Sequence, residues 1–419
     1  MKVMVAGGGI GGCALALSLH DAGIPDVEVY ESVGQVRELG VGINVLPHAV
    51  RDLAELGLLD DLVPRAVRTS ELGYYNRHGQ RIWVEPRGLA AGYRWPQLSI
   101  HRGELLGVLH RAVLDRLGAT RYRTGHHLVG FAQDGKSVRA TFSDRRTGAP
   151  VAQTEADVLV ACDGVHSTVR AALYPDEGPP LWNGITMWRG VTVSSPFLTG
   201  RTMIMAGVLA CRMVVYPIKD LPDGDQLLNW VAEVKVDDGR PMPKQDWDFE
   251  AAVDAVLPHF GTFTFDWLNV PQLIRGCERV LQYPMVDRDP LPGWTSGRVT
   301  LLGDAAHPMY PVGSNGASQA ILDARVLARE LALAPSIAEA LTAYEEQRRP
   351  ATSAVVLANR QVGPERCMEI VDQRAPDGFT NIFDVISRQE LEEIALSYKQ
   401  TAGFDSAAVN ERPSLSVRR

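Results

Sequence analysis

Three glycines near the start of the chain have the spacing of a dinucleotide-binding turn. Gly7, Gly9 and Gly12 form a G-x-G-x-x-G pattern after a short apolar run, and Glu31 ends the next apolar run. Glycines here permit a tight turn and let backbone N–H groups approach a pyrophosphate at the positive end of a helix. A carboxylate at Glu31 can bind a ribose diol and disfavours a 2′-phosphate. A merely flexible glycine loop would not need the strand, the helix and the acid, so we expect a site for FAD or NAD.

Two later segments place aspartates where apolar runs end. The run 157–162 leads into Asp163 and Gly164, and the run 298–302 leads into Gly303 and Asp304. A carboxylate at a strand end can accept hydrogen bonds from ribityl or ribose hydroxyls. The start of the helix expected after the second segment can stabilise an anionic reduced flavin. Taken singly, each segment could be a plain turn or a strand end.

Together with the N-terminal glycines, and in this order, the two segments resemble the three fingerprints of the group A flavoprotein hydroxylases, over roughly residues 1 to 365. The resemblance implies an α/β fold: a Rossmann-like FAD-binding domain of the glutathione-reductase and p-hydroxybenzoate hydroxylase type, with an inserted, mostly antiparallel β-sheet and C-terminal helices. It also implies that NADH or NADPH reduces FAD, that O₂ gives a C4a-hydroperoxyflavin, and that an OH group passes to an electron-rich aromatic ring.

The resemblance assigns roles to particular residues. Asp304 is expected to hold the ribityl chain, and Pro311 to lie beside the isoalloxazine ring as part of the catalytic site. Asp163 and Gly164 are expected to support the pyrophosphate and reduction by NAD(P)H. Arg102 resembles an arginine near the FAD phosphates, although a solvated charge is the alternative for it and for Arg37. The residues expected at the cofactor are Gly7, Gly9, Ile10, Gly11, Gly12, Glu31, Arg37, Gly42, Arg102, Asp163, Gly164, Arg170, Gly303, Asp304, Pro311, Gly313, Asn315 and Gly316.

A strand-like segment at 211–217 supplies the candidates for substrate binding. With a side-chain period of two, Arg212, Val214 and Tyr216 share one face, which we expect to line the pocket. In salicylate and hydroxybenzoate hydroxylases a histidine stands four residues before the Tyr-Pro pair, where this chain has Arg212. That difference argues against histidine-assisted phenol deprotonation. Arg212 could pair with a substrate carboxylate, and Arg189 is a second candidate; a structural ion pair is the alternative for each, and core packing for Tyr216.

The segments 184–191, 282–291 and 315–323 resemble the pyocyanin-forming phenazine hydroxylases within the same family. This resemblance implies a phenazine carboxylate or a related polycyclic or salicylate-like aromatic acid as substrate. Relatives on one fold act on different rings, so the reaction type is a firmer expectation than the substrate.

No metal site is expected. His307 lies within the Gly-Asp segment and is assigned a structural role, and the other histidines lack paired metal-binding spacing. The five cysteines are scattered without a C-x-x-C pair, which predicts reduced thiols.

The elements that must position these residues alternate between extended and helical patterns. Strands at 3–6 and 27–31 flank a helix at 10–22, strand-like runs follow between 183 and 236, and long helices are expected at 318–333 and 337–360. We expect an FAD-binding domain at 1–178, with 72–99 contributing to the substrate domain, and the substrate sheet at 179–279. The rest of the FAD-binding domain is expected at 280–362. Residues 363–419 are expected to form a helical segment whose tail, from about Asn410, is frayed.

Composition limits the partners. The net charge is −8, from 42 basic and 50 acidic residues, which gives no basic field for nucleic acid. No run is apolar enough to span a membrane, and the chain enters the glycine turn without a secretory signal, so a cytoplasmic location is expected. The expected partners are a small aromatic substrate and O₂, and the protein is expected to be a monomer or a homodimer.

Two alternatives to a monooxygenase remain open. One is a flavin oxidase or dehydrogenase without oxygen transfer, and the other is a non-catalytic flavin-binding sensor. A second G-x-G-x-x-G, expected in pyridine-nucleotide reductases and Baeyer–Villiger monooxygenases, is absent from the sequence.

Overall fold

The chain opens with the expected βαβ unit, in which β1 (Val3–Ala6) and β2 (Val27–Tyr30) flank α1 (Ile10–Asp21). The structure is a computed structural model that describes residues 1–35, 41–236, 242, 249–361 and 363–417. All four residues of β1 are buried, as expected for a parallel strand in a sheet that is covered on both faces. Helix α1 packs against α8 (Gly316–Leu333), so segments far apart in the sequence build one nucleotide-binding unit.

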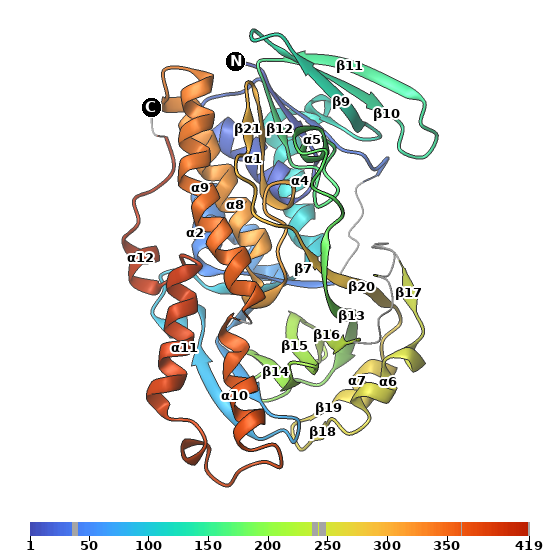
Figure 1. Cartoon of the computed structure of the whole chain (residues 1–419), viewed down its shortest axis with the longest axis vertical. Coiled ribbons are helices and arrows are strands. Elements are labelled where there is room, and N and C mark those ends of the chain that lie inside the picture. The colour runs from blue at the N-terminus through green and yellow to red at the C-terminus, as the bar shows by residue number, and fades with distance from the viewer. Residues whose placement is uncertain (36–40, 237–241, 243–248, 362, 418–419) are drawn as a thin grey trace.

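The sheet of this unit has six strands in the order β21-β22-β12-β1-β2-β8, parallel except for β21. Figure 1 shows α8 and α9 running side by side along it, with the three-stranded sheet β9-β10-β11 at the top of the view. The further elements of this half are β8 (Tyr122–Arg123), β9 (His127–Gln133), β10 (Val138–Ser143), β11 (Pro150–Ala156), β12 (Val158–Ala161), β21 (Thr295–Ser296), β22 (Val299–Leu301), α2 (Pro47–Glu55), α3 (Leu59–Leu62), α4 (Arg102–Leu117), α5 (Thr168–Leu173) and α9 (Ile337–Arg360).

The second large sheet has eight strands in the order β17-β20-β13-β16-β15-β14-β5-β6. It is antiparallel except where β14 pairs with β5. Its strands are β5 (Glu71–Tyr75), β6 (Arg81–Pro86), β13 (Leu181–Ser194), β14 (Thr202–Val208), β15 (Cys211–Asp220), β16 (Gln226–Lys235), β17 (Glu250–Ala251) and β20 (Val280–Asp287). The parallel and antiparallel sheets together confirm the predicted fold class; the domain boundaries drawn from the sequence stay a prediction.

The two faces of the eight-stranded sheet pack differently because side chains alternate along each strand. Trp230 and Met213 lie on one face, in a core with α6 (Leu257–Phe260) and α7 (Val270–Arg275). Tyr216 and Val214 lie on the other face, toward the nucleotide-binding unit. Smaller elements complete the architecture: β3 (Gly42–Val45), β4 (Ala66–Thr69) and β7 (Gln97–His101) in one sheet, and β18 (Thr264–Phe265) with β19 (Leu268–Asn269) in another.

The C-terminal segment folds back over the molecule. Helices α10 (Arg366–Arg374), α11 (Arg388–Thr401) and α12 (Ser406–Glu411) line one side of Figure 1 and lead back toward α2. The expectation of a frayed tail from Asn410 is wrong for the described part of that tail. Arg51 Nη2 donates to Arg412 O at 2.5 Å, and Arg412 Nη2 donates to Asp52 Oδ1 at 2.6 Å. The tail is held by polar contacts, so the scarcity of apolar residues in its sequence did not reveal that it is docked.

No helix among the described residues is long and apolar enough to cross a membrane.

The buried Asp52 makes the docked tail testable. Burial raises the pKa of Asp52 to about 6, and the charge of Arg412 opposes that rise. We expect Arg412→Ala to lower the free energy of unfolding by roughly 1–3 kcal/mol, because a buried charged acceptor loses its partner. At pH values between the ordinary pKa of an aspartate and about 6, Asp52 is more often protonated in the folded state than in the unfolded state. Its contribution to the free energy of unfolding therefore decreases as pH rises through this range. The decrease in the free energy of unfolding caused by Arg412→Ala should therefore be larger at about pH 8 than at about pH 5.

Thermal unfolding of Arg412→Ala beside Arg388→Ala checks this. Arg388 forms an exposed pair with Glu392, so its removal should change stability by less than about 0.5 kcal/mol. Equal effects of the two substitutions would contradict the docked tail.

Candidate active site

The glycine turn brings the ends of β1 and β12 together. Gly7 has a φ of +108°, and a Cβ there would lie 2.3 Å from Cys162 O. A Cβ on Gly12 would lie 1.9 Å from Gly7 O, so only glycine fits at either position. A Cβ on Gly9 would meet nothing within 4 Å. The turn thus presents open backbone at the start of α1, where a helix terminus favours an anion.

Glu31 ties the glycine turn to the end of β2. Gly8 N donates to Glu31 Oε2 at 2.7 Å, and Val33 N donates to its Oε1 at 2.9 Å. Glu31 also lines a cavity of about 300 Å³ with Asp163 and Gly164. Asp163 Oδ2 accepts from Thr168 N at 2.8 Å, and burial raises its pKa.

A buried carboxylate organises the turn that carries Asp304. Asp323 is fully buried, and its Oδ2 accepts from Gly303 N at 3.2 Å and lies 2.5 Å from His307 Nε2. Arg348 Nε donates to Asp323 Oδ1 at 2.7 Å. Although burial alone would raise it, the charges of His307 and Arg348 leave the pKa of Asp323 below its ordinary value. His307 therefore has the structural position expected of it, whereas Asp304 is exposed and faces the main cavity.

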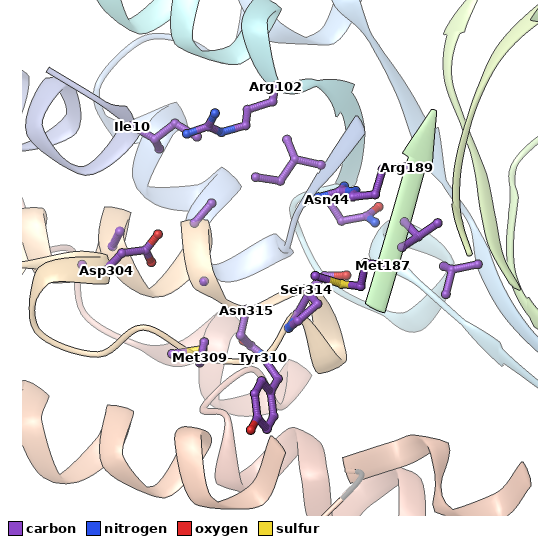
Figure 2. Close-up of a pocket in the computed structure, with 18 of the residues that line it drawn as sticks. Ile10, Asn44, Arg102, Met187, Arg189, Asp304, Met309, Tyr310, Ser314 and Asn315 are labelled. Carbon is purple, nitrogen blue, oxygen red and sulfur yellow. The ribbon is translucent and has the colours of Figure 1, made fainter. Parts of the chain in front are cut away.

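The main cavity has a volume of about 330 Å³ and lies between the nucleotide-binding unit and the eight-stranded sheet. In Figure 2, Ile10, Arg102 and Asp304 lie toward one end of it, and Met187 and Arg189 lie toward the other. Its sheet-side wall combines the apolar Met187, Met203, Met205, Val214 and Val231 with Arg189, Arg212, Tyr216 and Glu233. The loop before α8 contributes Met309, Tyr310, Pro311, Ser314, Asn315 and Gly316.

Arg212 points into this cavity but is already held by two carboxylates. Its Nε donates to Glu233 Oε2 at 2.6 Å, and its Nη1 pairs with Glu365 Oε2. All three side chains are buried. The structural ion pair that the sequence left open for Arg212 is therefore present, and two carboxylates occupy its guanidinium group.

Arg189 differs from Arg212 in its partners. Its Nη2 donates to Gly42 O at 2.6 Å, and its Nε–H is buried without a partner. Among the described residues no carboxylate lies within ion-pair distance of it, although the charge of Glu233 acts on it. Burial raises the pKa of the adjacent Tyr216, and the Arg189 charge opposes that shift. Arg189 thus presents a positive charge to the cavity without a carboxylate partner within the described chain.

Most residues expected at the cofactor line one of the two cavities: Gly7, Gly9, Ile10, Gly11, Glu31, Arg102, Asp163, Gly164, Gly303, Asp304, Pro311, Asn315 and Gly316. Arg170 does not, because its Nη1 donates to Ala305 O and Ala306 O and its Nε to Glu177. Gly12 closes the turn from behind, Gly42 N donates to Asn229, and Gly313 lines a smaller cavity. Arg37 lies outside the described residues.

Several lining residues were not expected. Asn44, Met203 and Met205 lie on β3 and β14. The side-chain period of two shows which residues of a strand share a face, but which face points into the cavity is known only once the strand pairing is known. Glu365 comes from the segment after α9, and no local pattern marked it.

The residues fit an elongated dinucleotide cofactor. The two cavities share Gly9, Cys162 and Gly164, so they form neighbouring parts of one site. A Cβ on Gly9, Gly164 or Gly316 would meet nothing within 4 Å, which leaves room for a ligand against the backbone. Glu31 would hold the ribose end of FAD and Asp304 the ribityl end.

Comparison with known proteins decides the family. The model of the FAD binding domain family matches residues 1–196 and 286–359. Phenazine 1,6-dicarboxylic acid hydroxylase from Lysobacter antibioticus is 47% identical over 362 residues, which cover 85% of this chain and 89% of that protein. The chain belongs to the FAD-dependent aromatic hydroxylases.

A further relative and a solved structure are similar to this chain. 3-Hydroxybenzoate 6-hydroxylase from Klebsiella oxytoca is 30% identical over 87% of this chain and 88% of its own. A salicylate hydroxylase in a substrate complex has a TM-score of 0.73 at 24% identity, with 100% of this chain and 98% of that chain covered, which shows the shared fold. This protein is an FAD-dependent aromatic monooxygenase, as the three fingerprints predicted, and NAD(P)H is the reductant typical of the family.

The exposed carboxylate of Asp304 is testable as a cofactor ligand. We expect Asp304→Ala to fold but to bind FAD at least about tenfold more weakly, because hydrogen bonds to a charged group contribute about 1.5–3 kcal/mol. The ratio of flavin to protein absorbance after purification and a titration with FAD measure this. Asp134→Ala, in a hairpin turn remote from both cavities, is the control. Full flavin occupancy in Asp304→Ala would refute the assignment.

Proposed function

We propose that this monooxygenase hydroxylates a carboxylated polycyclic aromatic substrate of the phenazine class, and that Arg189 binds the substrate carboxylate. The half-buried Arg189 guanidinium faces the main cavity beside its methionine side chains, without an ion-pair partner within the described chain, and this observation carries the proposal. A guanidinium is suited to a planar carboxylate because it can donate two parallel hydrogen bonds.

The apolar wall supports a flat, extended ring system. Met187, Met203 and Met205 project from β13 and β14 into the cavity. Methionine side chains are polarizable, adapt their shape and make favourable contacts with aromatic rings. The 47% identical relative is named for a phenazine dicarboxylic acid, which agrees with this choice.

The buried pair around Arg212 has a separate role in this proposal. Because Glu233 and Glu365 occupy its guanidinium, Arg212 supports the wall from which Val214 and Tyr216 project. Tyr216, which lines the cavity next to Arg189, is left to contact the ring or its substituents.

Bound FAD supplies the redox chemistry, accepting hydride from NAD(P)H and activating O₂. The protein then has to orient the ring and exclude water, because leakage of activated oxygen gives H₂O₂ instead of product. Pro311 and the loop that follows it would bound the flavin end of the cavity, and the methionines its far wall.

The experiment offers phenazine-1,6-dicarboxylate, phenazine-1-carboxylate, salicylate and 3-hydroxybenzoate separately to the FAD-loaded protein with NADH or NADPH under isotopically labelled O₂. We expect a phenazine to stimulate NAD(P)H oxidation most and to gain one labelled oxygen atom. Turnover of a phenazine without label would indicate an oxidase, and no ligand-dependent oxidation at all would favour a sensor. Preference for a single-ring acid would refute the phenazine class.

Substitution of Arg189 tests the carboxylate anchor. We expect Arg189→Met to lower kcat/KM for phenazine-1-carboxylate by about 10- to 100-fold, mainly through KM, since a charge-assisted hydrogen bond contributes about 1.5–3 kcal/mol. The corresponding carboxamide should lose much less. Arg201→Met, which removes an exposed pair with Asp220, is the control. Equal losses for acid and amide would remove the anchor role.

We also infer a cytoplasmic location and a monomer or homodimer. The five cysteines support the first, because all are free in the structure and thiols stay reduced in that compartment.

A further inference from the structure

The C-terminal helix α11 reaches the loop that precedes α8. The loop runs from Tyr310 to Asn315 along the main cavity, and Tyr398 of α11 lies behind it. Tyr398 is 5% exposed. Its hydroxyl is 3.0 Å from Val312 O and accepts from Asn315 Nδ2 at 2.9 Å. One phenol therefore contacts the middle and the end of the loop.

Asn359 of α9 completes this clamp. Its Oδ1 lies 2.7 Å from the Tyr398 hydroxyl, and its Nδ2 donates to Tyr310 O at 2.9 Å. A phenol carries one hydrogen, so Tyr398 donates either to Asn359 or to Val312 while it accepts from Asn315. The two side chains thus fix the first, middle and last parts of the loop.

The loop needs such support because of its backbone. Gly313 has a φ of +66° and Ser314 a φ of +59°, both in the left-handed region. A serine held there costs free energy and persists only where the surroundings enforce it. A Cβ on Gly313 would lie 2.2 Å from the Tyr398 oxygen, so loop and helix are in direct contact.

The same loop sets where α8 begins. Asn315 and Gly316 start this 18-residue helix and line the main cavity. The amino end of a helix carries a partial positive charge and unpaired N–H groups, which stabilise a nearby anion. A small displacement of the loop would move that end relative to a bound flavin.

We propose that Tyr398 is a positioning residue that holds the start of α8 against the flavin, so that the C-terminal segment sets how strongly the reduced, anionic cofactor is stabilised. The segment carrying Tyr398 lies beyond the matched FAD-binding region, which ends at residue 359. The proposal depends on FAD binding and is independent of which aromatic acid is the substrate.

The test is the midpoint potential of bound FAD in Tyr398→Phe. We expect reduced FAD to lose about tenfold more affinity than oxidised FAD, which lowers the two-electron potential by about 30 mV. We also expect the visible absorption of the bound flavin to shift and the H₂O₂ formed per NAD(P)H consumed to rise. The KM for the aromatic substrate should stay within about twofold, because no substrate contact is removed.

Tyr93→Phe is the matched control. Tyr93 is 7% exposed, lies in the same apolar cluster and donates to Phe404 O of the same C-terminal segment, but no described contact joins it to the loop. Both substitutions should lower thermal stability, and only Tyr398→Phe should move the potential. Equal potentials in both variants and the unsubstituted protein would overturn the proposal.

If Tyr398→Phe does not fold, the midpoint potential of bound FAD is measured in Asn359→Ala instead. It removes the partner of Tyr398 and the donor to Tyr310 O while leaving the phenol. A lowered potential in this variant supports the clamp, and an unchanged potential refutes it.

Discussion

The charge of Asp323 must be compensated inside the protein, and the arrangement that compensates it fixes the cofactor end of the site. A carboxylate without solvent is costly unless it is paired and hydrogen-bonded. Asp323 meets that condition through Gly303 N, His307 and Arg348, which come from the end of β22 and from α9. The same interactions therefore hold the Gly303 turn, from which Asp304 faces the cavity, against helix α8.

A second close approach acts at the other end of the cofactor site. The end of β1 lies so near the end of β12 that Gly7 leaves no space for a side chain, and Gly12 packs as closely against the Gly7 carbonyl. Between these two fixed points the backbone at Gly9, Gly164 and Gly316 stays open. Rigid strand ends thus define a site for an elongated ligand, and the eight-stranded sheet adds an apolar wall that a reaction sensitive to water requires.

The sequence predicted the parts of this site that are local and missed those that depend on pairing or on distant segments. The glycine turn, Glu31, Asp163 and Asp304 each follow a strand in a recognisable spacing, and the structure places all of them at the two cavities. Arg212 was predicted to face the pocket from the period of two, and it does. Its partners Glu233 and Glu365 lie 21 and 153 residues away, so no pattern along the chain could reveal that its charge is already balanced.

The C-terminal segment shows the same limit. Its tail from about Asn410 is polar, which predicts fraying when each residue is considered by itself. In the structure, Arg51 donates to a carbonyl of the segment, and Tyr398 contacts the loop before α8. Such contacts depend on where α2 and α8 lie in space, which sequence periodicity does not give.

The most direct test of this account is a crystal structure of the FAD-loaded protein with phenazine-1-carboxylate bound. We expect FAD to lie along the two neighbouring cavities, with its ribityl chain at Asp304. We expect the phenazine to lie against Met187, Met203 and Met205, with its carboxylate on Arg189. A carboxylate bound instead at Arg102, or a ring seated outside the main cavity, would contradict it.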